Sequence, residues 1–145
     1  MKFLNWNVHG FVGGDGVYDP ARIADVLGKL GPAVAALQEI DLRQTDIDLV
    51  AQLNAVVGPH CVRAPAMGSG EHWYGQVLLS RYPVVRYKIH DLTFNDAEPR
   101  RLIDAVLDVG ETMVRVLATH LGLTRRERVY QFDIIRCVVN ADARM

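Results

Sequence analysis

The stretch NWNVHG, residues 5–10, alternates apolar and polar side chains in the rhythm of a β-strand. Trp6 and Val8 fall on one face, as expected for a strand that is buried on one side. Asn5 and Asn7 fall on the opposite face, although asparagine is disfavoured in strands. This row of hydrogen-bonding side chains either meets water or leads into a site.

The segments that follow predict a second strand parallel to the first. Asp19 is suited to cap a helix with Pro20 in its first turn, and apolar residues recur at helical spacing as far as Leu30. Gly31-Pro32 stops this helix, and the apolar run AVAALQEI at residues 33–40 reads as a strand. A strand, a helix and a second strand within so short a stretch of chain form a βαβ unit, whose two strands are parallel.

The middle of the chain predicts one more helix and then a series of antiparallel strands. The helix is expected from Gln44 to Val57, with Thr45 as its N-cap and Asp48 completing a capping box. Turn residues separate the strands that follow. These strands are expected at residues 61–66, 74–80, 84–90, 101–109 and 113–119.

The end of the chain predicts a last helix. Thr124 and Glu127 form another capping box at its start. Four apolar residues are expected to face inward from this helix, namely Val129, Phe132, Ile135 and Val139.

No internal repeat, low-complexity segment or linker interrupts the chain, so residues 1–145 are interpreted as one α/β domain.

Composition narrows the functions that are open to this domain. Half of its 145 residues are hydrophobic, which is ample for a core. The net charge of −1 argues against tight binding of duplex nucleic acid but leaves a local basic patch open. Cys61 and Cys137 form no disulfide framework or zinc motif and are interpreted as buried thiols in a reducing compartment. Without a secretory signal or an apolar stretch of membrane-spanning length, we expect a cytoplasmic protein.

Polar side chains follow three apolar strands at their carboxyl ends. Asn7 and His9 end the first strand, Glu39 ends the second, and His120 follows the strand VRVLAT. Ligands gather beyond the carboxyl ends of parallel strands, so Asn7 and Glu39 should meet at one edge. One carboxylate with one amide oxygen suits a hard cation such as Mg²⁺, with Mn²⁺ as a possible substitute.

Five ordered segments of this sequence resemble the endonuclease/exonuclease/phosphatase superfamily. They are NWNVHG, VAALQEID, YGQVLLSRYP, EPR and ATHLGLTRRER, and they are distributed along almost the whole chain. The resemblance implies a DNase I-like four-layer α/β/β/α sandwich. It also implies Mg²⁺-dependent hydrolysis of a phosphoester.

The resemblance assigns roles to six residues of the motifs. Asn7 and Glu39 match family residues of the metal and phosphate site, and Glu39 matches the carboxylate that binds the metal. His120 matches the histidine that contacts the scissile phosphate, which completes the expected catalytic set. Three further residues are candidates for substrate binding, namely Arg100 in EPR, His9 and Tyr74. The substrate itself, whether nucleic acid, lipid or small molecule, stays open, although the slight negative charge disfavours long duplex DNA.

The motifs do not complete the family's site. Family members take their general base from an Asp-His pair near the carboxyl terminus, after a Gly-Asp-x-Asn strand, and this chain reaches VVNADARM without either. The resemblance thus covers the first half to two-thirds of the domain, and residues 1–145 are interpreted as truncated before its C-terminal part. A piece of a longer enzyme is the favoured explanation. The alternatives are a shortened product that pairs with another copy, or replacement of the missing residues by unrelated ones.

Two classes of function remain in competition. One is a Mg²⁺-dependent phosphoester hydrolase. The other is a catalytically inactive half-domain that acts as a binding or dimerisation module, which the absent Asp-His pair favours.

The resemblance also leads us to expect an uncovered surface. Family members pack two sheets face to face about 10 Å apart, and this chain is expected to supply essentially one of them. Its inner face, with Val77, Leu79, Ile103, Ala105 and Trp6 or its neighbours, would exceed the apolar patches that soluble monomers expose. A twofold homodimer that packs sheet against sheet would cover that face.

Overall fold

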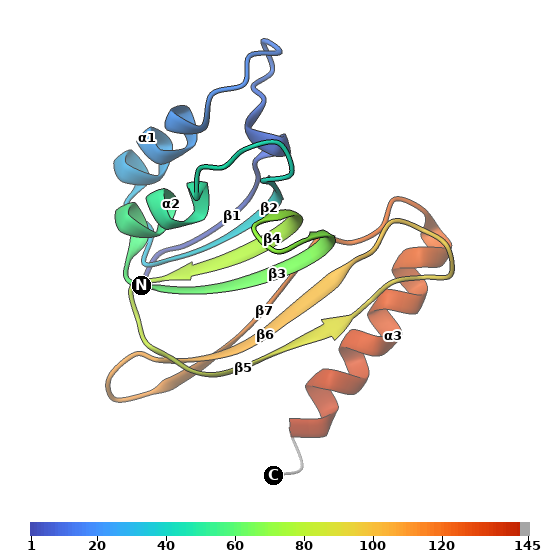
Figure 1. Ribbon diagram of the computed structural model, residues 1–145. Coiled ribbons are helices and arrows are strands. Elements are labelled where there is room, and N and C mark those ends of the chain that lie inside the picture. The colour runs from blue at the N-terminus through green and yellow to red at the C-terminus, as the bar shows by residue number, and fades with distance from the viewer. Residues whose placement is uncertain (143–145) are drawn as a thin grey trace.

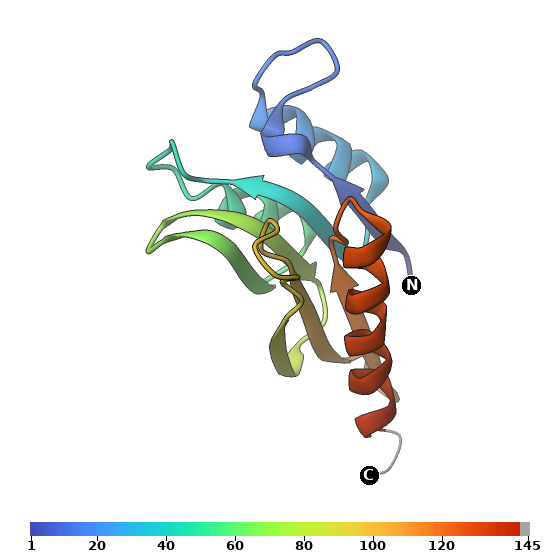
Figure 2. The same ribbon diagram turned by 90° about the vertical axis from the view of Figure 1, so that its right-hand side faces the viewer.

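The computed structural model of the protein describes residues 1–142, and it arranges three helices around two β-sheets (Figure 1). The sheets stack face to face, with α1 and α2 outside one and α3 outside the other, as the two views show (Figure 2). This order is the predicted α/β/β/α sandwich. In chain order the elements are β1 (Phe3–Asn7), η1 (His9–Phe11), α1 (Pro20–Leu30), β2 (Val34–Asp41), α2 (Leu49–Val57), β3 (His60–Ser69), β4 (His72–Ser80), β5 (Val84–Asp91), β6 (Arg101–Asp108), β7 (Met113–Thr119) and α3 (Arg125–Asp142).

The first sheet has the strand order β1-β2-β4-β3. β1 and β2 are parallel, with Asn7 opposite Gln38, which confirms the predicted βαβ unit. The local signals for α1 act as expected, because the Asp19 carboxylate accepts a hydrogen bond from the Arg22 backbone and Gly31 ends the helix in the left-handed conformation. The parallel pairing brings the carboxyl ends of β1 and β2 together.

The second sheet consists of β5, β6 and β7, all antiparallel. The expectation that this chain supplies only one sheet is therefore wrong. The sequence pattern predicted that all strands after α2 would follow one another as antiparallel strands. In the structure the turn after Ser80 starts a new sheet instead of continuing the first.

Two apolar cores hold the layers together. One lies between the first sheet and helices α1 and α2, and it contains Val77 and Leu79. The other lies between the two sheets and contains Ile103 and Ala105. All four side chains are at most 1% exposed, so the uncovered face expected from the sequence does not exist. The reason for expecting a sheet-on-sheet homodimer is thereby removed, since the second sheet of the same chain provides the cover.

Helix α2 begins later than the sequence suggested. It starts at Leu49 with Asp48 as the N-cap, where Asp48 accepts a hydrogen bond from the Ala51 backbone. Thr45 instead accepts a hydrogen bond from the Ile47 backbone, which stabilises a turn before the helix. The prediction of Thr45 as the N-cap is therefore wrong.

Helix α3 begins with the expected capping box but turns a different face inward. Thr124 and Glu127 exchange hydrogen bonds at its start, which confirms the box. Val129, Phe132 and Val139 are 55%, 56% and 42% exposed, so the prediction that they face inward is wrong.

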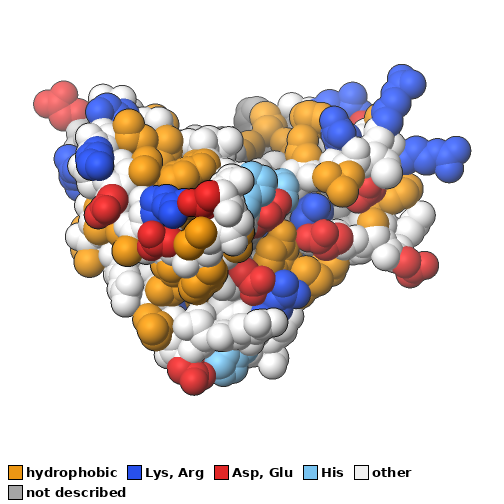
Figure 3. All heavy atoms as spheres, turned by 90° about the horizontal axis from the view of Figure 1, so that it is seen from above, with side chains coloured by type: hydrophobic (Ala, Val, Ile, Leu, Met, Phe, Trp, Pro, Cys, Tyr) orange, Lys and Arg blue, Asp and Glu red, His pale blue; other side chains and the backbone are white. Residues whose placement is uncertain are grey.

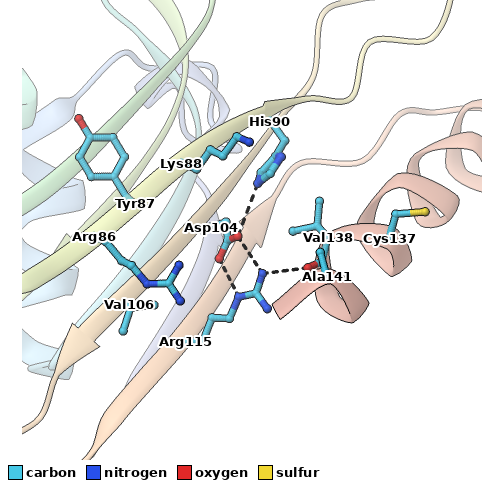
Figure 4. Close-up of a pocket in the computed structure, with 10 residues that line it drawn as sticks. All are labelled: Arg86, Tyr87, Lys88, His90, Asp104, Val106, Arg115, Cys137, Val138 and Ala141. Carbon is cyan, nitrogen blue, oxygen red and sulfur yellow. Dashed lines mark hydrogen bonds and ion pairs between the residues drawn. The ribbon is translucent and has the colours of Figure 1, made fainter. Parts of the chain in front are cut away.

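A charged network fixes α3 to the outer face of the second sheet (Figure 4). Arg115 on β7 donates two hydrogen bonds of 2.8 Å to the Asp104 carboxylate on β6 and a third to the Val138 carbonyl of α3. His90 lies 3.5 Å from the same carboxylate. The network borders a hollow of about 510 Å³ between helix and sheet. Polar contacts thus take a large part in docking this helix.

Among the helices in residues 1–142, none has the length and apolar character that crossing a bilayer requires.

Candidate active site

The site is built around Glu39, which occupies an irregular position in β2. The pairing with β4 shifts register between Gln38 and Ile40, so Glu39 is the extra residue of a β-bulge. Its φ is 57°, in the left-handed region that glutamate rarely adopts. Bulges re-aim a side chain relative to its strand. Here the bulge turns the Glu39 carboxylate toward the carboxyl end of β1.

Asn7 holds this carboxylate from the neighbouring strand. Its amide nitrogen donates a 2.8 Å hydrogen bond to Glu39 Oε1. Its amide oxygen accepts a 2.9 Å hydrogen bond from the backbone of His9. Because a backbone N–H can only donate, this contact fixes the orientation of the Asn7 amide. Asn7 therefore presents its donor to Glu39 and its acceptor to the His9 backbone.

Two imidazoles flank the carboxylate. His9 Nδ1 lies 3.5 Å from Glu39 Oε2, and His120 Nε2 lies 3.7 Å from Glu39 Oε1. His120 follows β7, so it reaches Glu39 from the second sheet. The predicted convergence of Asn7, Glu39 and His120 is confirmed. The sequence predicted that three strand ends would meet at one edge. In the structure, His120 comes instead from the facing sheet.

The surroundings of His120 favour its neutral form. Burial lowers the pKa of His120, the nearby Arg100 guanidinium lowers it further, and the Glu39 carboxylate acts in the opposite direction. A neutral imidazole can donate from one nitrogen and accept at the other.

Tyr74 and Arg100 lie beside His120 and line one small hollow with it. Arg100 is only 5% exposed and donates a 2.7 Å hydrogen bond to Glu98. Burial raises the pKa of Tyr74 to about 12, and the charges of Glu39 and Glu98 act in the same direction. Tyr74 therefore keeps its hydroxyl proton near neutral pH and can donate a hydrogen bond.

Gln76 ties the two sheets together behind this hollow. From β4 its amide nitrogen donates to the carbonyls of Arg101 on β6 and Ala118 on β7, at 2.7 and 3.3 Å. Gln76 Oε1 and Arg100 Nε are both buried without a hydrogen-bond partner among the described residues. Both residues line a hollow of about 10 Å³, roughly the space of one water molecule.

The donor set fits a single hard cation at the Glu39 carboxylate. Mg²⁺ keeps several waters and often uses only one or two carboxylates, and the Glu39 side chain is 25% exposed. Within residues 1–142, no three His, Cys, Asp or Glu side chains gather as a complete metal site. Glu39 can thus act as one ligand among waters and substrate oxygens.

Sequence reasoning missed three contributors to this region. Gln76 was available as a polar residue within the apolar strand YGQVLLS, and Glu98 directly precedes Pro99-Arg100. Arg43 lies over the Tyr74 ring at 5.1 Å and carries no pattern in the sequence that points to this contact.

Seen from above, the face that carries the site has a mixed charge (Figure 3). Histidine side chains lie near its middle with acidic side chains beside them, and Lys and Arg side chains project toward both ends.

Comparisons with known proteins agree with this geometry. The sequence matches the profile of the Endonuclease/Exonuclease/phosphatase family over residues 4–142. No curated protein matches it significantly.

Several solved structures share its fold. An endonuclease/exonuclease/phosphatase from Beutenbergia cavernae has a TM-score of 0.76 and 24% identity, with 93% of this chain and 43% of that chain covered. TDP2 from D. rerio, complexed with a single-strand DNA product, has a TM-score of 0.69 and 18% identity, with 97% and 54% covered. The 3′ phosphatase NExo from Neisseria, bound to a product DNA hairpin, has a TM-score of 0.57 and 22% identity, with 92% and 48% covered. The chain thus spans about half the length of these structures.

Proposed function

Because the chain belongs to the Endonuclease/Exonuclease/phosphatase family, we propose that it carries the metal- and phosphate-binding part of a phosphoesterase. The reaction is Mg²⁺-dependent hydrolysis of a phosphodiester or phosphomonoester, with Mn²⁺ as a substitute. The observation that carries this proposal is the meeting of Asn7, Glu39 and His120 from two different sheets.

The charge of the site supports the need for a cation. A phosphate group beside the Glu39 carboxylate would meet a like charge at short range. Glu39 would hold a divalent cation, which would remove this conflict and would supply Lewis-acid stabilisation of charge on a phosphoryl oxygen. Asn7 was also expected as a metal ligand. The amide oxygen of Asn7 accepts one hydrogen bond and keeps a second lone pair for that role, while its amide nitrogen holds the Glu39 carboxylate in place.

The remaining residues supply hydrogen bonds and positive charge to the substrate. His120 donates to the transferring phosphoryl group, and the buried Arg100 guanidinium adds charge-assisted donors. Tyr74 contributes a neutral hydroxyl donor next to them, and the exposed His9 marks the entrance on the other side of Glu39. The general base of the reaction is not assigned to any residue.

A binding or dimerisation module without catalysis is the second candidate. It is favoured by the same observation that limits the metal site, namely that no three His, Cys, Asp or Glu side chains gather as a metal site within residues 1–142. The cytoplasmic location stays a prediction.

Substitution of the site residues tests the enzyme proposal. We expect Mg²⁺-dependent hydrolysis of bis-p-nitrophenyl phosphate that EDTA abolishes and Glu39→Gln removes, since the amide loses the charge that holds the cation. His120→Ala should lower turnover by about 10²–10³-fold, as expected for a transition-state donor. Asp25→Asn, an exposed carboxylate on α1, is the matched control and should retain full activity.

Calorimetric titration with Mg²⁺ and Mn²⁺ separates the two candidates. Cation binding that Glu39→Gln removes, without any hydrolysis, would favour the binding module. Equal cation binding by wild type, Glu39→Gln and Asp25→Asn would show that Glu39 is not the metal ligand.

A further inference from the structure

A shallow surface hollow lies between the β5–β6 loop and the start of α3. We call it the Phe94 hollow. Its volume is about 590 Å³, and it is lined by Phe94, Arg125, Arg126, Val129, Tyr130 and Asp133. None of these residues takes part in the cluster around Glu39.

Two loops connect the Phe94 hollow directly to the site. The loop after β5 carries Phe94 at its start and the buried Arg100 at its end. The loop after β7 begins with His120 and leads to Arg125, the first residue of α3. Both sides of the hollow are therefore carried by the same loops that carry Arg100 and His120.

The hollow offers positive charge that the protein itself does not use. Within the described part of the chain, Arg125 and Arg126 form no ion pair or side-chain hydrogen bond. Asp133, at the far side of the hollow, is paired with Arg136 at 3.0 Å. The Thr124 hydroxyl caps the Glu127 N–H in the first turn of α3. The arginine side chains are thus the groups available to an anion.

Aromatic rings lie beside these arginines. Phe94 and Tyr130 contact each other with ring centroids 5.3 Å apart, and Tyr130 remains 42% exposed. Val129, 55% exposed, extends the apolar floor. Arginines next to exposed aromatic rings are the combination that binds single-stranded nucleic acid, where the arginines hold phosphates and the rings stack on bases.

We infer that the Phe94 hollow binds the nucleotides of a single-stranded nucleic acid next to the scissile phosphate. The inference rests on the proposed function only in placing that phosphate at Glu39. The two arginines beside the paired Phe94 and Tyr130 rings offer positive charge next to a stacking surface, which suits a phosphate and its base. A single-stranded nucleic acid also agrees with the small net charge of the protein. The two arginines of the hollow create a local positive potential and need no overall positive charge.

Fluorescence anisotropy with a labelled thymidine oligonucleotide of about ten nucleotides tests the inference. The double variant Arg125→Glu/Arg126→Glu should weaken binding by at least about tenfold and reduce the salt dependence of log K by roughly one, as expected when phosphate contacts are lost. Tyr130→Ala should weaken binding by on the order of tenfold through lost stacking. All substituted side chains are exposed or line the open hollow, so circular dichroism should show an unchanged fold.

A double variant with the same change in charge serves as the control. Lys29→Glu/Arg81→Glu places both substitutions at exposed positions of α1 and of the turn after β4, and it should bind the oligonucleotide like wild type. An equal loss of affinity in both double variants would overturn the inference, because total charge rather than the hollow would then control binding. Absence of oligonucleotide binding by wild type would overturn it as well, and binding to anionic phospholipid vesicles instead would identify a lipid surface.

Hydrolysis of bis-p-nitrophenyl phosphate distinguishes this inference from the proposed function. That small substrate does not reach the hollow, so Arg125→Glu/Arg126→Glu should leave its turnover unchanged. Oligonucleotide binding through the hollow without any hydrolysis would support the inference and contradict the enzyme proposal.

Discussion

Glu39 combines an unusual backbone with a functional side chain. Its left-handed φ of 57° costs an ordinary residue about 1–2 kcal/mol. The β-bulge that imposes this conformation also directs the carboxylate to Asn7 and His120. Strained backbone of this kind persists where the surrounding structure over-determines it, and it clusters at functional positions.

Two substitutions at this position should reverse the usual order of stability. In a regular strand alanine is more stable than glycine by roughly 0.5–1 kcal/mol. At residue 39 we expect Glu39→Gly to be more stable than Glu39→Ala by about 1 kcal/mol, because only glycine adopts the left-handed conformation without strain. Both variants remove the carboxylate equally, so chemical denaturation of the pair isolates the backbone. A more stable alanine variant would mean that position 39 carries no strain.

At the scale of the element, the βαβ unit was the part of the site that the sequence could predict. Parallel pairing follows from local signals such as Asp19 and Gly31, and it places Asn7 beside Glu39 whatever the rest of the chain does. The bulge at Glu39 has no local signature, because it arises from pairing with a strand that follows some 30 residues later in the chain. The position of His120 beside Glu39 depends on how the two sheets stack. The family resemblance predicted this stacking, whereas the spacing of residues did not.

Helix α3 shows where periodicity misleads. An apolar stripe predicts a buried face only if hydrophobic burial decides how the helix is placed. Here Arg115 binds the Val138 carbonyl and Gln131 donates to the Leu92 carbonyl, so polar contacts orient the helix and leave Phe132 exposed.

Removing the charged network should loosen this helix in a pH-dependent way. The Arg115 guanidinium holds the pKa of Asp104 below its ordinary value of 3.8. A carboxyl group with a lowered pKa in the folded state stabilises the protein above its unfolded-state pKa, and this contribution is lost as the pH falls through the folded-state pKa. Asp104→Asn should therefore cost about 1–3 kcal/mol at pH 7, and less at about pH 3, which lies below that ordinary value.

Denaturation with urea at both pH values provides the measurement. Asp25→Asn, which removes an exposed carboxylate of α1, should be nearly neutral at either pH. A deficit for Asp104→Asn that stays constant with pH would show that packing, not the ion pair, is lost.

For the whole molecule, the face-to-face packing of two sheets within one chain predicts cooperative unfolding. Ile103 is fully buried between the sheets, whereas Trp73 is buried on the other side of the first sheet, under the helices. Ile103→Ala should cost about 2–5 kcal/mol. If the layers unfold together, tryptophan fluorescence and far-ultraviolet circular dichroism should shift to the same new midpoint.

The exposed Val85 on β5 provides the control, since Val85→Ala should change stability by less than about 0.5 kcal/mol. A fluorescence transition that stays at the wild-type midpoint in Ile103→Ala would mean that the first sheet and its helices unfold independently of the second sheet.

Because the site is divided between two sheets, the fraction of molecules in which it is fully assembled depends on how the sheets are positioned relative to each other. Asn7 and Glu39 belong to one sheet and Arg100 and His120 to the edge of the other, with Gln76 as the tie between them. A small sliding or breathing motion of one sheet against the other would disperse these groups while leaving each sheet folded. Apparent affinity for a phosphate then equals the intrinsic affinity multiplied by the fraction of time that the sheets are in register. A bound ligand that bridges both sheets would, by the same linkage, clamp them together and slow the exchange of the amide hydrogens that lie between them.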